Sequence, residues 1–278
     1  MKKIVACVDG AGYTESVCDY AAWAAIRLGL PLEFLHVLIR QADARLDASG
    51  SIGLCAQESL LAELASLDEQ RSALAREHGR RILEAVRERA LSLGATEVDL
   101  RQHHGELMDS LLELEEDTRL YVLGKHNYQA KPKRFLLDHN LESAVRTVRR
   151  PVLVTSEQFK APQSFMIAFD ASATARKMVE MVADSPILQG LRCSVVMVGG
   201  EAEPLQWAQQ RLAQVGFEVS VQRLEGEAAE TLIEFSERAG LDMLVMGAYG
   251  HSRIRQWVVG STTTAILRQI RIPVFILR

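Results

Sequence analysis

Four residues near the C-terminus have the types and spacing of a phosphate-binding loop. Gly247, Gly250, Gly260 and Ser261 follow the pattern Gly-x2-Gly-x9-Gly-Ser. Glycine lets the backbone turn tightly and approach a ligand without a Cβ in the way. A helix that begins at Ser261 offers free N–H groups and the positive end of its dipole to an anion. The spacing therefore predicts a phosphate site.

Neighbouring residues add donors and positive charge to this loop. Thr262 carries a hydroxyl next to Ser261, while His251 and Arg253 lie between the second and third glycines. A glycine turn followed by an ordinary serine N-cap is the alternative interpretation. The four positions together favour the phosphate site over that alternative.

The loop belongs to the second of two copies of one sequence pattern. Ile4–Asp9 matches Phe165–Asp170, and Leu32–Val37 matches Cys193–Val198, in both cases 161 residues further on. Later matching pairs are offset by only 121 to 123 residues. The first copy therefore contains extra chain between residues 38 and 80. Leucines at helical spacing there predict a long amphipathic helix that ends near Leu93, and we interpret it as cover for the fold in preference to a partner-binding helix.

Within each copy, apolar runs alternate with helical patterns. This alternation predicts an α/β fold of two tandem open five-stranded parallel sheets flanked by helices. We expect two domains, residues 1–156 and 162–278, joined by a polar segment that contains Pro162. Bare sheet edges are rare, so we expect the last strands, Pro151–Thr155 and Pro273–Leu277, to pair within the chain as a pseudo-dimer. A further homodimer stays open.

Ligands of such sheets bind at the carboxyl ends of the strands, where Asp170 and Gly247 stand. The residues Met246–Arg255 and Val259–Thr264 around the loop resemble the universal stress protein family, whose ATP-binding members share the Gly-x2-Gly-x9-Gly-Ser/Thr motif. The resemblance covers nearly the whole chain as a tandem two-domain member. It implies a Rossmann-like, adenine nucleotide alpha hydrolase-like fold with strand order 3-2-1-4-5. It also implies ATP or another adenine nucleotide as the ligand, with Mg²⁺ as an accompanying ion.

The resemblance assigns roles by position. It places Asp170 and the backbone of Ala168 against the adenine, with the backbone of Val198 at the adenine edge. The ribose and phosphates would pass Gly247 and Gly250 and reach the helix N-terminus. The complete expected nucleotide site comprises Ala168, Asp170, Val198, Gly247, Gly250, His251, Arg253, Gly260, Ser261 and Thr262.

The first copy departs from this motif. It keeps Asp9 and Gly124, but Asn127, Asp138 and His139 stand where the second copy has glycine, glycine and serine. A carboxylate at a helix N-terminus occupies the positive end of the dipole itself and repels phosphate. We therefore predict that the first copy does not bind ATP in the same way.

The loop of the first copy is basic. Lys125 opens it, and further basic residues follow. An anion site for another ligand is one interpretation, but a solvated basic loop is preferred.

Composition and missing motifs limit the remaining function classes. The net charge of −4 argues against nucleic acid or an anionic membrane as the main partner. The N-terminus lacks the apolar core of a signal peptide, so the expected location is the cytoplasm. No metal site is expected from the isolated cysteines. Nucleophile elbows and Walker lysines are also missing, so no catalytic residue is assigned.

The preferred function is a stress-response protein that acts as a nucleotide-dependent sensor or regulator. A slow ATPase or nucleotidyl-transferring enzyme is the first alternative, because fold alone does not exclude catalysis. A ligand-free interaction protein is the second.

Overall fold

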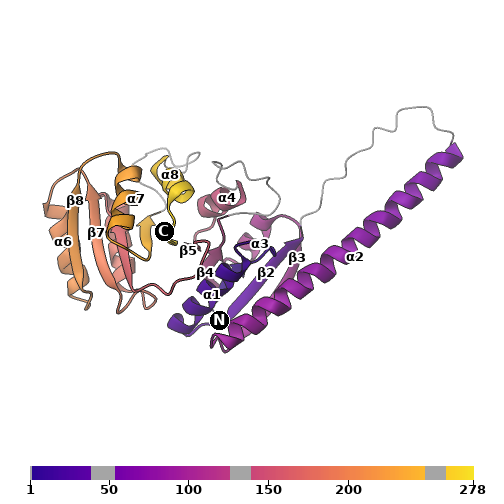
Figure 1. Ribbon diagram of the computed structural model, residues 1–278, viewed down its shortest axis with the longest axis horizontal. Coiled ribbons are helices and arrows are strands. Elements are labelled where there is room, and N and C mark those ends of the chain that lie inside the picture. Colours follow the sequence, from indigo (N-terminus) through magenta and orange to yellow (C-terminus); the bar gives the residue numbers. More distant parts are fainter. Residues whose placement is uncertain (1, 39–53, 126–138, 248–260) are drawn as a thin grey trace.

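The computed structural model describes residues 2–38, 54–125, 139–247 and 261–278 (Figure 1). In the N-terminal half, strands alternate with helices in the order β1 (Lys3–Cys7), α1 (Thr14–Leu28), β2 (Leu32–Leu38), α2 (Leu54–Ser92), β3 (Val98–His104), α3 (Leu107–Leu114), β4 (Thr118–Leu123), α4 (His139–Thr147) and β5 (Val152–Val154).

The C-terminal half repeats this alternation. Its elements are β6 (Ser164–Ala168), α5 (Ala173–Ala183), β7 (Arg192–Val198), α6 (Glu203–Ala213), β8 (Val219–Leu224), α7 (Ala228–Arg238), β9 (Leu244–Gly247), α8 (Ser261–Gln269) and β10 (Val274–Leu277).

The described strands form one ten-stranded sheet in the order β3-β2-β1-β4-β5-β10-β9-β6-β7-β8. Each half has the order 3-2-1-4-5 that the family resemblance implies, and all pairs within a half are parallel. The halves join where β5 and β10 run antiparallel, with Leu153 opposite Phe275. The predicted pairing of the last strands is therefore confirmed, and both sheet halves gain a partner at an edge that would otherwise be bare.

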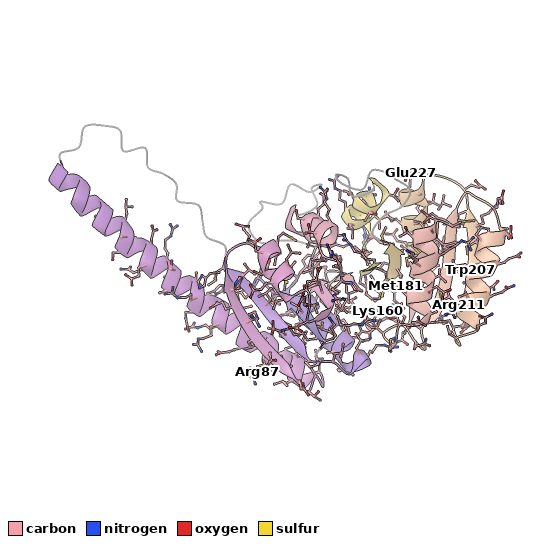
Figure 2. All side chains as sticks on the ribbon, turned by 180° about the vertical axis from the view of Figure 1, so that it is seen from behind. Arg87, Lys160, Met181, Trp207, Arg211 and Glu227 are labelled. Atoms are coloured by element: carbon pink, nitrogen blue, oxygen red, sulfur yellow. The ribbon has the colours of Figure 1, made fainter. Side chains whose placement is uncertain are left out.

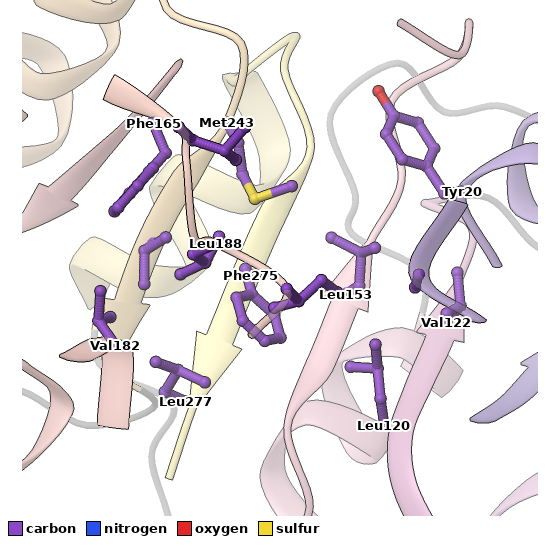
Figure 3. Packing of buried hydrophobic residues seen from close by; sticks show 14 of the residues in the cluster. Tyr20, Leu120, Val122, Leu153, Phe165, Val182, Leu188, Met243, Phe275 and Leu277 are labelled. Carbon is purple, nitrogen blue, oxygen red and sulfur yellow. The ribbon is translucent and has the colours of Figure 1, made fainter. Parts of the chain in front are cut away.

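Helices cover both faces of the sheet. Buried residues of α1, α2, α5 and α6 share one apolar cluster, and those of α3, α4, α7 and α8 share another on the opposite face. The first cluster runs across the junction of the halves, where Leu153 and Phe275 lie between Val122 and Val182 (Figure 3). The apolar core is thus continuous from one half to the other.

Polar contacts also cross the junction. Arg27 Nε donates to the carbonyl of Ile187 at 2.7 Å, and its Nη2 donates to that of Gln189. The Tyr20 hydroxyl lies 3.0 Å from Ser156 Oγ, so the segment between the halves is also held against α1.

Helix α2 is the main departure from the repeat. It has 39 residues and extends well past the sheet (Figure 1). Only its C-terminal part packs on the fold, where Leu83, Val86 and Ala90 are buried. Gly79 lies close against the sheet, since a Cβ there would lie 2.4 Å from His36 and 2.2 Å from Gln102. The interpretation of this helix as cover for the fold therefore holds for its inner part alone.

Candidate functional site

The expected site lies at the carboxyl end of β6, between β7 and β9. Ala168 pairs with Val196, two residues before Val198, and Met166 pairs with Leu244, three residues before Gly247. The helices that follow β6 and β9 cover opposite faces of the sheet. This is the topological switch point at which open α/β sheets bind ligands.

Asp170 follows β6 in a turn that its own carboxylate stabilises. Its Oδ1 accepts the Ser172 N–H at 3.0 Å, and Ser172 Oγ in turn accepts the Ala175 N–H at 3.1 Å as the N-cap of α5. Ala171 between them has φ 59°, the one positive φ of a non-glycine residue in the described part of the chain. The turn leaves Asp170 exposed beside the strand end.

Gly247 ends β9, and its described surroundings differ from those of its counterpart in the first half. A Cβ at residue 247 would lie 3.8 Å from Thr174 Cγ2, an ordinary van der Waals contact. At the matching Gly124 a Cβ would lie only 2.9 Å from Tyr13 Cβ. The packing of described residues therefore requires glycine at 124 but not at 247. Sequence reasoning missed Thr174 as a neighbour of this site.

Helix α8 begins at Ser261, and its second residue, Thr262, is half-buried. The predicted site residues Gly250, His251, Arg253 and Gly260 lie outside the described residues, as does the side chain of Ser261. The structure thus brings Ala168, Asp170, Val198 and Gly247 to one edge of the sheet. The phosphate loop between β9 and α8 stays a prediction.

The equivalent edge of the N-terminal half is arranged differently. Asp9 Oδ1 accepts the Ala11 N–H at 2.9 Å, and the Thr14 hydroxyl lies 3.3 Å from it. A Cβ at Gly10 would lie 2.6 Å from Ile82 Cδ1 of α2. In the C-terminal half the corresponding helix, α6, begins only at Glu203. Side chains of α2 therefore lie over the end of β1, whereas near the end of β6 Trp207 of α6 stacks on Phe169.

Lys125 corrects one sequence-based interpretation. It follows β4 and is buried, so it is not part of a solvated loop. Its Nζ donates to the carbonyl of Ile270, which follows α8 of the other half. Burial lowers the pKa of Lys125 to about 8. Lys125 therefore connects the halves. The loop residues Asn127 and Asp138 lie outside the described residues, and of His139 only the backbone is described.

A separate groove of about 430 Å³ lies between α2 and β3. Its charged side chains pair along the helix, with Arg80 bound to both Glu77 and Glu84. These pairs neutralise the lining charges, so the groove presents no concentrated charge to a ligand. No group of three or more His, Cys, Asp or Glu suited to a metal ion occurs among the described residues.

Comparison with known proteins identifies the family. The family model described as "Universal stress protein family" matches residues 1–156 and 195–278. The chain belongs to the universal stress protein family. It is similar to the universal stress protein Slr1230 of Synechocystis sp., with 34% identity over the full length of both chains.

Solved structures share the fold over nearly the whole chain. A universal stress protein of Archaeoglobus fulgidus superposes with a TM-score of 0.75 at 16% identity and covers 99% of this chain and 98% of its own. A Pseudomonas aeruginosa PAO1 protein of unknown function gives a TM-score of 0.62 at 14% identity, covering 100% and 92%. At these identities the likeness concerns the fold. No described helix is long and apolar enough to cross a bilayer.

Proposed function

We propose that this universal stress protein binds ATP or another adenine nucleotide in its C-terminal half and acts as a nucleotide-dependent sensor or regulator. One observation carries the proposal. The Gly-x2-Gly-x9-Gly-Ser pattern starts at the last residue of β9 and ends at the first residue of α8, next to the switch point. A strand–loop–helix unit with these residues suits a phosphate chain.

The adenine and ribose would occupy the ends of β6 and β7. Ala168 and Val198 are half-buried there and offer backbone groups, and exposed Asp170 stands at the rim. Phosphates would follow the glycines toward the N-terminus of α8, with His251 and Arg253 as sources of positive charge. Gly260, Ser261 and Thr262 would donate to them.

We propose Mg²⁺ only as an ion that binds together with the nucleotide. The described residues supply the single carboxylate of Asp170 at this edge, and Mg²⁺ is often bound through one or two carboxylates together with substrate phosphates. The ion is therefore proposed as a companion of the phosphates, with no site of its own.

We also propose that the chain divides into domains of residues 1–156 and 162–278, of which only the second binds nucleotide. The cover of α2 over β1 supports this asymmetry, because Ile82 lies against Gly10 at the end of β1. The motif residues of the loop assign no catalytic base, so we propose regulation by binding rather than turnover.

A thermal-shift experiment on the full chain tests the proposal. ATP at about 100 times its dissociation constant stabilises a one-site protein by about 2.7 kcal/mol, so we expect a clear rise in Tm. Gly260→Asp, which copies Asp138, should abolish the rise. Gln222→Glu, which adds the same charge on the exposed face of β8, should keep it.

Two results contradict the proposal. The first is that ATP, ADP and AMP leave Tm unchanged. The second is that Gly260→Asp responds to ATP as the wild type does. Steady phosphate release that Ser261→Ala abolishes would instead favour a slow ATPase.

A further inference from the structure

The outer part of α2 exposes an apolar row without any described element beside it. All residues from 65 to 76 are exposed, and among them Leu67 is 49% and Leu74 is 70% exposed. Figures 1 and 2 show this part of the helix extending away from the sheet and from all other helices. Large apolar side chains in such a position mark interaction surfaces.

The exposed leucines form one row along the helix, next to the face that packs against the fold further on. Leu64, Leu67 and Leu74 fit the three- and four-residue spacing of one helix face, with Arg71 and His78 in the same row. Four and eleven residues beyond His78, this row reaches Ile82, which covers Gly10, and Arg89, which binds Asp19 of α1 at 2.6 Å. Inside the fold this row borders the buried face of the helix, where Leu83, Val86 and Ala90 lie.

Charge along the outer helix has two opposite blocks. Residues 63–70 contain Glu63, Asp68 and Glu69 and no basic residue, which gives a formal charge of −3. Residues 71–81 contain four arginines and Glu77, which gives +3 with His78 neutral. A helix of this kind is complementary to a second copy of itself that runs in the opposite direction, and a parallel copy would place like charges together.

We propose that the outer part of α2 pairs with the same segment of a second copy of this chain as an antiparallel two-helix coil. Core positions of antiparallel coils face each other in layers. The leucine spacing places Leu64 opposite Leu74 of the second copy, and Leu67 opposite the aliphatic stem of Arg71. In this register the guanidinium of Arg71 meets Asp68 of the second copy, twice per dimer.

The dimer surface is distinct from the β5–β10 pairing, which is satisfied within the chain. The helix pair covers less area than a standard interface, so we expect an association that weakens on dilution. Sedimentation velocity of the full chain over a range of concentrations should therefore show a monomer–dimer equilibrium.

Leucine variants test the surface. Leu67→Glu combined with Leu74→Glu should raise the dissociation constant by ~30-fold or more, because the central layers lose their apolar contacts. Leu112→Glu is the matched control, since Leu112 is 44% exposed on α3, away from α2. That variant should dimerise as the wild type does.

Mixing of charge variants tests the antiparallel direction and the register of the helix pair. Asp68→Arg alone and Arg71→Asp alone place like charges opposite each other, so each should sediment as a monomer. An equimolar mixture restores both cross-pairs and should form a heterodimer. If a substitution lowers the helix content of its own chain, it does so equally in the separate variant and in the mixture. Recovery of the dimer on mixing therefore reports the contact between chains.

Three results overturn the proposal. One is a wild-type chain that stays monomeric at every concentration. Another is a dimer that survives the paired leucine variant. The third is a mixture of the charge variants that stays monomeric while the wild type dimerises.

Discussion

Ile82 of α2 lies over Gly10 at the end of β1, so close that a Cβ on residue 10 would come within 2.6 Å of Ile82 Cδ1. In the second half the corresponding helix α6 starts at Glu203, and its Trp207 stacks on Phe169 near the end of β6. The two halves therefore share a topology but differ at the edge where a nucleotide would bind. Neighbouring side chains, as well as the loop sequence, distinguish them.

Restoring the motif should not restore a site in the N-terminal half. The triple variant Asn127→Gly, Asp138→Gly and His139→Ser recreates the motif residues, but Ile82 still covers the end of β1. Equilibrium dialysis with labelled ATP should show the same number of bound nucleotides per chain as the wild type. A second bound nucleotide would mean that the loop alone excludes ATP from this half.

Replacement by alanine should lower stability at Gly124 and ATP affinity at Gly247, the two glycines at the strand ends. Gly124→Ala places a Cβ 2.9 Å from Tyr13 Cβ and should lower the free energy of unfolding by about 1–3 kcal/mol. Among the described residues, a Cβ in Gly247→Ala meets only Thr174 Cγ2 at 3.8 Å, so stability should change by less than ~0.5 kcal/mol while ATP affinity falls about tenfold. Urea unfolding and calorimetric titration measure the two effects. Unchanged ATP affinity in Gly247→Ala would remove the proposed role of Gly247.

Lys125 should make stability depend on alkaline pH. Burial lowers its pKa to about 8, whereas a lysine of the unfolded chain titrates near about 10.4. Between these values the unfolded chain binds more protons, so the wild-type protein gains stability relative to Lys125→Met as pH rises. The gain should reach up to ~3 kcal/mol and then level off. A difference in unfolding free energy between wild type and Lys125→Met that stays constant from about pH 7 to 10, measured by urea unfolding, would contradict this account.

Asp242 should matter at neutral pH and lose its effect in acid. Burial acts to raise its pKa, but Lys160 Nζ, the Gln163 and Ser164 N–H groups and the Ser164 hydroxyl outweigh burial, so the pKa of Asp242 lies below its ordinary value. Asp242→Asn should cost about 1–3 kcal/mol at neutral pH. The wild-type advantage should persist above about pH 3.9, the unfolded value, and disappear as pH falls through the folded pKa.

Urea unfolding of wild type and Asp242→Asn across this acid range checks the direction of the pKa shift of Asp242. Glu157→Gln, an exposed change in the same polar segment, serves as the control and should match the wild type throughout. A difference for Asp242→Asn that grows in acid would show that the native carboxyl has a raised pKa instead.

Much of the fold follows from the sequence because the repeated segments form the buried strands. The matching runs ending at Val37 and Val198 became β2 and β7, and the expected pairing of the last strands is present as Leu153 opposite Phe275. Contacts between distant residues were beyond such patterns. The bond from Arg27 to Ile187 joins residues 160 positions apart, and no local periodicity records it.

Helix α2 shows where periodicity stops being informative. Leu67, Leu74 and Ile82 share one helix row, yet Ile82 is partly buried and both leucines are exposed. Spacing gives the face of a helix but not its neighbour. Of the site, the sequence predicted the strand-end residues that the structure brings together, while Thr174 beside Gly247 and the cover over Gly10 required coordinates.

The central claim is one nucleotide site per chain, formed by the C-terminal half. Isothermal titration calorimetry of the nucleotide-free full chain with ATP tests it most directly, because it reports affinity and stoichiometry together. We expect one ATP per chain in the wild type and no binding in Gly260→Asp. Two sites per chain, or binding that survives Gly260→Asp unchanged, would contradict the account.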